Sequence, residues 1–85
     1  NLIMSEFKMV YVTKYALSVG IEHIEVITTS SPEYVRENKR YARDFHKGDW
    51  FEDKEQAIFK AEVMRNKKIL SLQKQIEKLE RLSFE

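Results

Sequence analysis

The sequence contains no cysteine, one proline and two glycines among its 85 residues. Without cysteine, the chain can form neither a disulfide bond nor a thiolate metal site. Two glycines are too few for the glycine-rich loops that hold phosphate groups. The two histidines, His23 and His46, are not at a spacing that metal ligands use. We therefore expect no metal site and no cofactor.

Long apolar runs are also missing. The longest one is far shorter than the ~20 residues that a membrane-spanning helix needs. The N-terminal residues NLIMSEF lack the basic region and apolar stretch of a signal peptide. We therefore expect a cytoplasmic protein with no membrane partner. Because the sequence does not begin with methionine, Met4 or Met9 is a candidate start, and residues 1–6 are expected to be disordered or vector-derived.

A chain of this length is expected to form a single domain with a thin core. Domains of this size usually need a disulfide, a metal or a partner subunit for stability. Because the first two are excluded, oligomerisation is the remaining source of stability. We expect a homo-oligomer, with a dimer as the default.

The basic residues are concentrated in one short segment. The net charge is +1, and the excess lies in residues 34–47, where five Lys and Arg residues accompany two acidic ones. A chain that is nearly neutral gains little from the counterion release that drives binding to duplex nucleic acid. We therefore do not expect duplex DNA or RNA as a partner.

The first half of the sequence predicts an antiparallel β-meander over residues 7–51. Residues 7–17 and 21–28 are rich in β-branched and aromatic side chains and predict two strands, joined by a turn at Gly20. Residues 34–37 and 40–46 predict a hairpin around Asn38 and Lys39. The meander then has about four strands.

The second half predicts one long amphipathic helix over residues 53–84. Asp53 is a good N-cap, and Gln56 completes a pattern like a capping box. No glycine or proline follows. The predicted fold class is therefore α+β: a small antiparallel sheet followed by one long C-terminal helix, in a single domain.

The predicted helix has more apolar surface than the sheet can cover. A helix of 30 residues is ~45 Å long, whereas a strand of eight residues covers only ~27 Å, so about a third of the helix extends past the sheet. One apolar stripe includes Ile69 and has coiled-coil spacing in its last part. A second strip lies on roughly the opposite side. We predict an oligomer interface at Phe59, Val63, Leu70, Leu72, Ile76 and Leu79.

Two alternatives remove the need for a second chain. The sheet can curl enough to cover one strip while Phe59 and Leu70 are simply exposed, or the helix can break near Asn66.

The basic segment interleaves cations with aromatic rings. Arginine offers a planar fork to phosphate or carboxylate groups, and rings offer stacking surfaces for bases. We predict an anionic ligand, such as a nucleotide, bound by Arg36, Arg40, Tyr41, Arg43, His46 and Trp50. In the alternative reading, Tyr41, Phe45 and Trp50 form the core under the helix, and the cations only solvate the outer face.

The sequence offers little for catalysis. His23 lies near Glu22 and Glu25, and His46 near Asp44, so each histidine could form an acid–base pair. Alternating polar residues on a solvated strand face explain these neighbours equally well. We therefore predict no catalytic residue, and keep a small enzyme using His23 or His46 as an alternative.

Three segments carry a resemblance: YVTKYAL, FHKGDWFEDKEQA and KKILSLQKQIEKLERLSF. Together they resemble small proteins encoded by bacteriophages and prophages, in which a short β-meander is followed by one helix rich in Lys and Glu. The resemblance implies an accessory protein in the host cytoplasm that inhibits a host component by binding, for example by sequestering a nucleotide signal. Fold-level analogy alone does not establish such a function.

The sequence thus favours a non-catalytic, homo-oligomeric binding protein with an anionic ligand. The first alternative is a protein–protein inhibitor or assembly factor that docks a host protein through the helix, with Phe59, Val63 and Leu70 as the docking strip.

Overall fold

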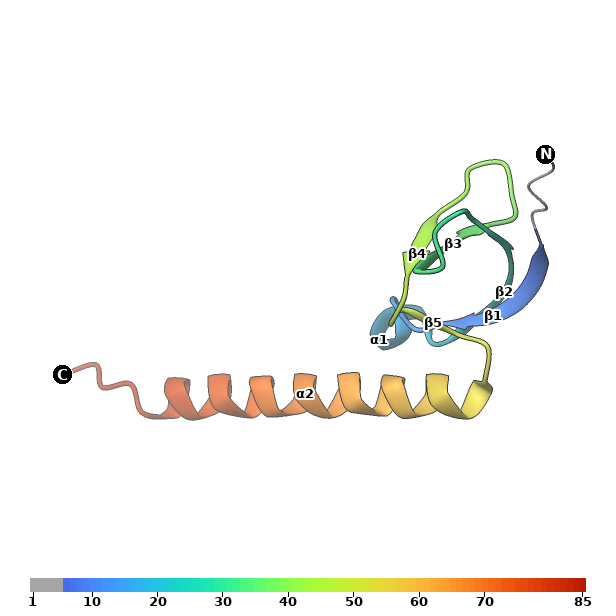
Figure 1. Cartoon of the computed structure of the whole chain (residues 1–85). Helices are drawn as coiled ribbons and strands as arrows, with labels where there is room; N and C mark the ends of the chain where they lie inside the picture. The colour runs from blue at the N-terminus through green and yellow to red at the C-terminus, as the bar shows by residue number, and fades with distance from the viewer. Residues whose placement is uncertain (1–5) are drawn as a thin grey trace.

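The computed structural model describes residues 6–85, so residues 1–5 of the segment expected to be disordered or vector-derived lie outside the described part. The expected α+β architecture is confirmed: an antiparallel sheet of five strands precedes one long helix (Figure 1). The sheet order is β4-β3-β2-β1-β5. The elements are β1 (Phe7–Val12), α1 (Ala16–Val19), β2 (Glu22–Thr28), β3 (Tyr34–Glu37), β4 (Asp44–His46), β5 (Trp50–Phe51) and α2 (Lys54–Glu80).

The sheet curls around a small core (Figure 1). We call the sheet, its core and α1 together the head. Alternate residues of each strand point inward, so Val10 and Val12 of β1 meet Val26 of β2. Val35 and Phe45 complete the fully buried cluster, and Ile24 and Trp50 pack against it. The core is thin, as expected for a domain of this size.

The fifth strand was not predicted from the sequence. β5 pairs with β1, so that Trp50 lies opposite Val12. The buried Thr13 extends this contact, because its backbone N–H donates to the carbonyl of Asp49 at 2.9 Å. A strand of two residues has no readable periodicity, and its position depends entirely on pairing with β1.

The strand predicted over residues 7–17 is too long. β1 ends at Val12, and the chain then turns so that the backbone N–H of Ala16 donates to the carbonyl of Thr13 at 3.0 Å. The short helix α1 replaces the rest of the strand. The predicted turn glycine is confirmed, since Gly20 has a φ of 85° directly after α1.

The predicted hairpin at 34–46 is correct in its partners and wrong in its turn. β3 pairs with β4 in antiparallel fashion, but the loop covers residues 38–43, and the second strand begins only at Asp44. The backbone N–H of Glu37 donates to the carbonyl of Arg43 at 2.8 Å, which closes the hairpin four residues later than expected. Asn38 turns away and donates its backbone N–H to Glu25 of β2.

The long helix is confirmed, with a shorter C-terminal end than predicted. α2 has 27 residues, with Asp53 at the N-cap position, but no side-chain capping bond forms there, so the capping box is wrong. The helix ends at Glu80, where Leu82 donates its backbone N–H to the carbonyl of Leu79 and tightens the last turn. Within the described residues, no helix combines the length and apolar character needed to cross a bilayer.

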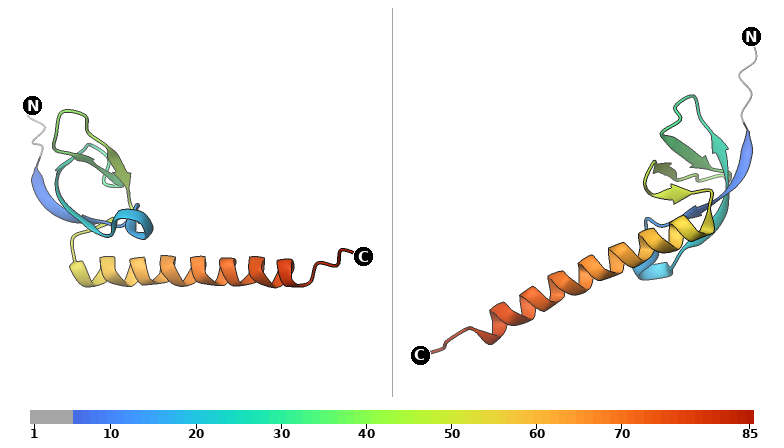
Figure 2. Two further views of the ribbon diagram at one scale, coloured as in Figure 1. Left: turned by 180° about the vertical axis from the view of Figure 1, so that it is seen from behind. Right: turned by 60° about the horizontal axis from the view of Figure 1, so that its bottom comes forward.

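Only the first part of α2 lies against the head. Ala57 is buried, and Ile58, Ala61 and Met64 are half-buried beneath β5, β1 and α1. From Arg65 to the end of the chain every residue is exposed, and the helix extends away from the head as a free rod (Figures 1 and 2). We call residues 65–80 of α2 the overhang. The molecule measures 73 × 25 × 20 Å as a result.

The helix does not break near Asn66, so that alternative is wrong. The alternative of a curled sheet is correct for the sheet, but the curl closes over the core of the head and leaves the overhang uncovered.

Candidate functional site

Arg43 lies in the β3–β4 loop and connects this loop to β2 and β3. Its guanidinium donates to the Oε2 of Glu37 on β3 at 2.8 Å and to the Oε2 of Glu22 on β2 at 3.1 Å. The Glu37 side chain is only 7% exposed, and the Arg43 side chain is 34% exposed. Arg43 thus stabilises the sheet by compensating a buried carboxylate.

The ion pair lowers the pKa of Glu37 to about 2, chiefly because the side chain of Arg43 donates hydrogen bonds to the ionised carboxylate. Its ordinary pKa is 4.5, so the folded state favours the charged form. The stabilisation is therefore fully present above about pH 4.5, and it is lost as the pH falls through about 2.

Arg36 is also occupied by a carboxylate. It lies opposite Asp44 in the β3–β4 ladder and donates its Nε–H to the Oδ1 of Asp44 at 2.8 Å. The pair is exposed on the outer face of the sheet, and it lowers the pKa of Asp44 through the hydrogen bond from Arg36. An exposed pair of this kind contributes little stability, and an anionic ligand would have to compete with Asp44 for Arg36.

Arg40 and Tyr41 form the tip of the β3–β4 loop. The guanidinium of Arg40 lies 5.4 Å from the centroid of the Tyr41 ring, and Tyr41 is 78% exposed. Within the described residues, Arg40 takes part in no ion pair. This tip is the part of the predicted ligand site that remains available to an external anion.

The two remaining predicted residues lie apart from this tip. His46 is exposed on the outer face beside Tyr34, with ring centroids 5.5 Å apart. Trp50 lies on β5 and is half-buried against the core. The alternative reading of the aromatic residues is therefore correct for Phe45, which is buried, and for Trp50, but not for the exposed Tyr41.

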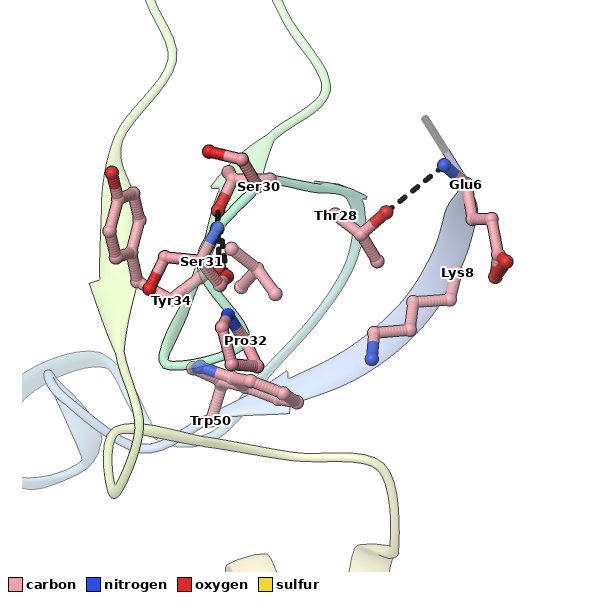
Figure 3. Close-up of a pocket in the computed structure, with 10 residues that line it drawn as sticks. Glu6, Lys8, Thr28, Ser30, Ser31, Pro32, Tyr34 and Trp50 are labelled. Carbon is pink, nitrogen blue, oxygen red and sulfur yellow. Dashed lines mark hydrogen bonds between the residues drawn. The ribbon is translucent and has the colours of Figure 1, made fainter. Parts of the chain in front are cut away.

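Trp50 also forms one wall of a pocket of about 360 Å³ near the N-terminal end of β1 (Figure 3). Pro32 lies over the indole ring, and the hydroxyl groups of Ser30 and Ser31 lie on the side of the β2–β3 loop. The Nζ of Lys8 lies 4.7 Å from the Trp50 ring centroid and binds Glu52 at 2.6 Å. None of the other five predicted ligand residues lines this pocket.

The six predicted ligand residues are thus not gathered at one place. Sequence reasoning missed Lys8, which sits above Trp50 from a strand far away in the sequence. It also missed Glu22 and Glu37 as the partners of Arg43. The alternating pattern of β2 places Glu22 on the core-facing side, and this was the available signal for a buried ion pair.

The candidate acid–base histidines have few polar contacts. His23 stacks on Tyr11 with ring centroids 4.1 Å apart and an angle of 8° between the planes. The Asp44 neighbour of His46 is engaged by Arg36. Among the described residues, no group of His, Asp and Glu side chains is arranged to hold a metal ion.

The overhang carries an uncovered apolar stripe. Ile69 is 45% exposed and Leu79 is 67% exposed, and the stripe continues along the side of α2 that packs against the head. Its exposed members are Ile69, Leu72, Ile76 and Leu79.

A second apolar strip lies on the opposite side of α2. Phe59 is exposed, Val63 is half-buried, and both line an open hollow of about 640 Å³ together with Phe51 of β5. Leu70 continues this strip and lines another hollow with Lys67, Lys74 and Lys78.

Comparisons with protein-family models, with curated proteins and with solved structures found no match to this chain.

Proposed function

We propose that the protein is a non-catalytic binding protein that acts as a homodimer. The observation that carries this proposal is the overhang, in which four large apolar side chains at coiled-coil spacing are left uncovered by residues 6–85. Leaving such a stripe in water costs ~0.8 kcal/mol for each CH₂ group that burial would remove from solvent.

The spacing of the stripe supports a two-stranded assembly. Ile69 and Ile76 take the a positions of a heptad, and Leu72 and Leu79 take the d positions. Apolar residues at a and d form a seam along which the side chains of one helix insert between those of a second helix. An oligomer also supplies stability to a small domain that has no cysteine with which to form a disulfide.

The oligomeric state of the intact protein tests the proposal directly. We expect light scattering after size exclusion to give twice the chain mass at micromolar concentration, because burial of the stripe offsets the entropy of association. A monomer at 100 micromolar, where the overhang remains in water, would contradict the proposal. It would also leave both apolar sides of α2 to a foreign partner.

The ligand that we propose is an anion held at the β3–β4 loop tip. Arg40 provides a guanidinium that forms no ion pair among the described residues, and Tyr41 provides an exposed ring beside it. This combination suits a nucleotide, whose phosphate and base need a cation and a stacking surface. With the phage resemblance, the proposed role is to sequester such a signal in a host cytoplasm.

Thermal-shift measurements with a panel of nucleotides test the ligand. A bound nucleotide should raise Tm by an amount that grows with its concentration. Arg40→Ala should abolish this shift and leave the Tm of the free protein unchanged. The matched control is Arg36→Ala, whose cation is already paired with Asp44, and which should keep most of the shift. An equal shift in wild type and Arg40→Ala would exclude the loop tip as the site.

A second candidate function is docking of a host protein on the second apolar strip. The specific observation in its favour is the hollow between Phe51 and Phe59, which adjoins the head and is mostly apolar. Phe59 is 68% exposed, and an exposed aromatic residue beside a hollow is typical of interface anchors. The lysines along the same side of α2, Lys60, Lys67, Lys74 and Lys78, favour an acidic partner.

A further inference from the structure

The head determines how two overhangs can meet. The apolar stripe of the overhang lies on the same side of α2 as Ala57 and Ala61, and that side is covered by the head in the first part of the helix. If a second α2 ran parallel along this stripe, its first part would occupy the volume of the head (Figures 1 and 2). An antiparallel partner avoids this overlap, because its own first part lies beyond the C-terminal end of the overhang.

We propose that two copies pair antiparallel through their overhangs, and that the C-terminal tail of each copy packs on α1 of the other. This inference rests on the proposed homodimer and adds its direction, its register and a contribution of the head to the interface.

One register pairs every apolar side chain of the stripe with another. In it, Ile69 faces the partner's Leu79 and Leu72 faces the partner's Ile76, so two-fold symmetry gives four apolar layers. Moving the partner by one heptad in one direction places Glu62 and Arg65 opposite Leu79 and Ile76. Moving it in the other direction places Ile69 beyond the end of the partner's α2 at Glu80. The register is therefore fixed by the stripe itself.

The side chains that flank the stripe are compatible with this register. In an antiparallel pair, each flank meets the same flank of the partner. On one flank, Gln75 meets the partner's Gln75, and Lys68 lies beyond the end of the partner's α2. On the other, Gln73 meets the partner's Gln73, and Asn66 can donate to the partner's Glu80. No pair of like charges is brought together, so the flanks do not oppose antiparallel pairing.

Four apolar layers are few for an independent coiled coil, since isolated helices of this length are marginal in water. The head offers the additional contact. α1 is the part of the head nearest the overhang, and it carries Leu17 and Val19, which are 51% and 68% exposed (Figure 1). The antiparallel register brings the partner's Leu82 and Phe84 to this place, and both are exposed in the single chain.

Disulfide cross-linking tests the direction, since the chain has no cysteine of its own. We expect neither Ile69→Cys nor Leu79→Cys to form a covalent dimer alone, because each residue lies ~15 Å along the axis from its own copy. An equal mixture of the two variants should form a covalent dimer under mild oxidation, because Cα atoms that face each other lie within the ~7 Å that a disulfide allows.

The outcomes separate this inference from the proposed function. Efficient self-cross-linking of Ile69→Cys would show a parallel dimer, which overturns the antiparallel inference and leaves the homodimer intact. Both positions are exposed in the single chain, so the variants should fold. A monomeric wild-type protein would instead contradict both proposals.

The contact with α1 has its own readout. Val19→Asp should weaken dimerisation by at least tenfold in a concentration series, with an unchanged circular dichroism spectrum, because it places a charge under the partner's apolar tail. The control is Lys74→Asp, which changes the charge on the side of the overhang away from the stripe and should keep the wild-type dissociation constant. Equal dissociation constants for Val19→Asp and wild type would exclude α1 from the interface.

Discussion

Ile76→Asp should convert the protein into a monomer at concentrations where the wild type is a dimer. Ile76 lies near the middle of the stripe and is 53% exposed in the single chain, so the substitution does not disturb the head. In the dimer, the same position faces the partner's Leu72, and burial of an unpaired carboxylate there costs several kcal/mol. We expect the dissociation constant to rise by at least a hundredfold, as measured by sedimentation equilibrium.

The control for this substitution is Lys74→Asp. It makes a larger change in charge on the opposite side of the same helical turn, and it should leave the mass unchanged. The helical content of both variants should remain close to that of the wild type, because neither residue packs against the head. If Ile76→Asp remains a dimer, the overhang stripe is not the interface.

Arg43→Ala should destabilise the head strongly and not merely remove a ligand contact. The substitution leaves the Glu37 carboxylate buried without its main partner, and breaking a buried pair in this way costs 3–5 kcal/mol. Because Arg43 is itself about one-third exposed, we expect the lower end of this range, about 3 kcal/mol, which lowers Tm by at least about 12 °C in a domain of this size. Thermal unfolding followed by circular dichroism measures the shift.

The control here is Arg36→Ala, which breaks the exposed pair with Asp44 and should change Tm only slightly.

The dependence of stability on pH is a second measurement of the same pair. The wild type should lose stability as the pH falls from about 4.5 towards 2, because the pKa of Glu37 is lowered to about 2 by Arg43. The stability of Arg43→Ala should depend less on pH over this range. Similar Tm values for the two variants would show that Arg43 does not stabilise the head by pairing with Glu37.

The architecture could be predicted from the sequence because its two parts have strong periodicity. α2 begins at the predicted N-cap and has no glycine or proline to interrupt it, and its stripe has a helical period over many turns. β2 alternates as expected, with Val26 buried and Glu25 exposed. The extent of α2 and the alternation of β2 depend on residues close in sequence, so they can be predicted from local sequence patterns.

The errors arose where distant residues decide the local structure. The alternation through Tyr15 and Leu17 predicts a strand, but Thr13 pairs with Asp49 and the chain leaves the sheet. Arg43 shows the same effect at the candidate site. Its place beside Tyr41 and Phe45 in sequence suggests an external anion, whereas Glu22 and Glu37 from two other strands supply internal ones. Whether an arginine can bind an external anion depends on carboxylates from other strands, and the spacing of residues along the sequence does not reveal these.

The length of the overhang has a consequence for targets that carry more than one binding site. In the antiparallel dimer, the midpoint lies near Lys74, about 13 residues beyond the part of α2 beneath each head, so the heads are held ~40 Å apart. A rigid spacing of this kind gives high avidity only for ligands presented at a matching interval, and little for those that are closer or farther apart. Inserting one paired heptad into each overhang would lengthen the interval by ~10 Å without altering either head, and so would change which repeated arrays the dimer can bridge.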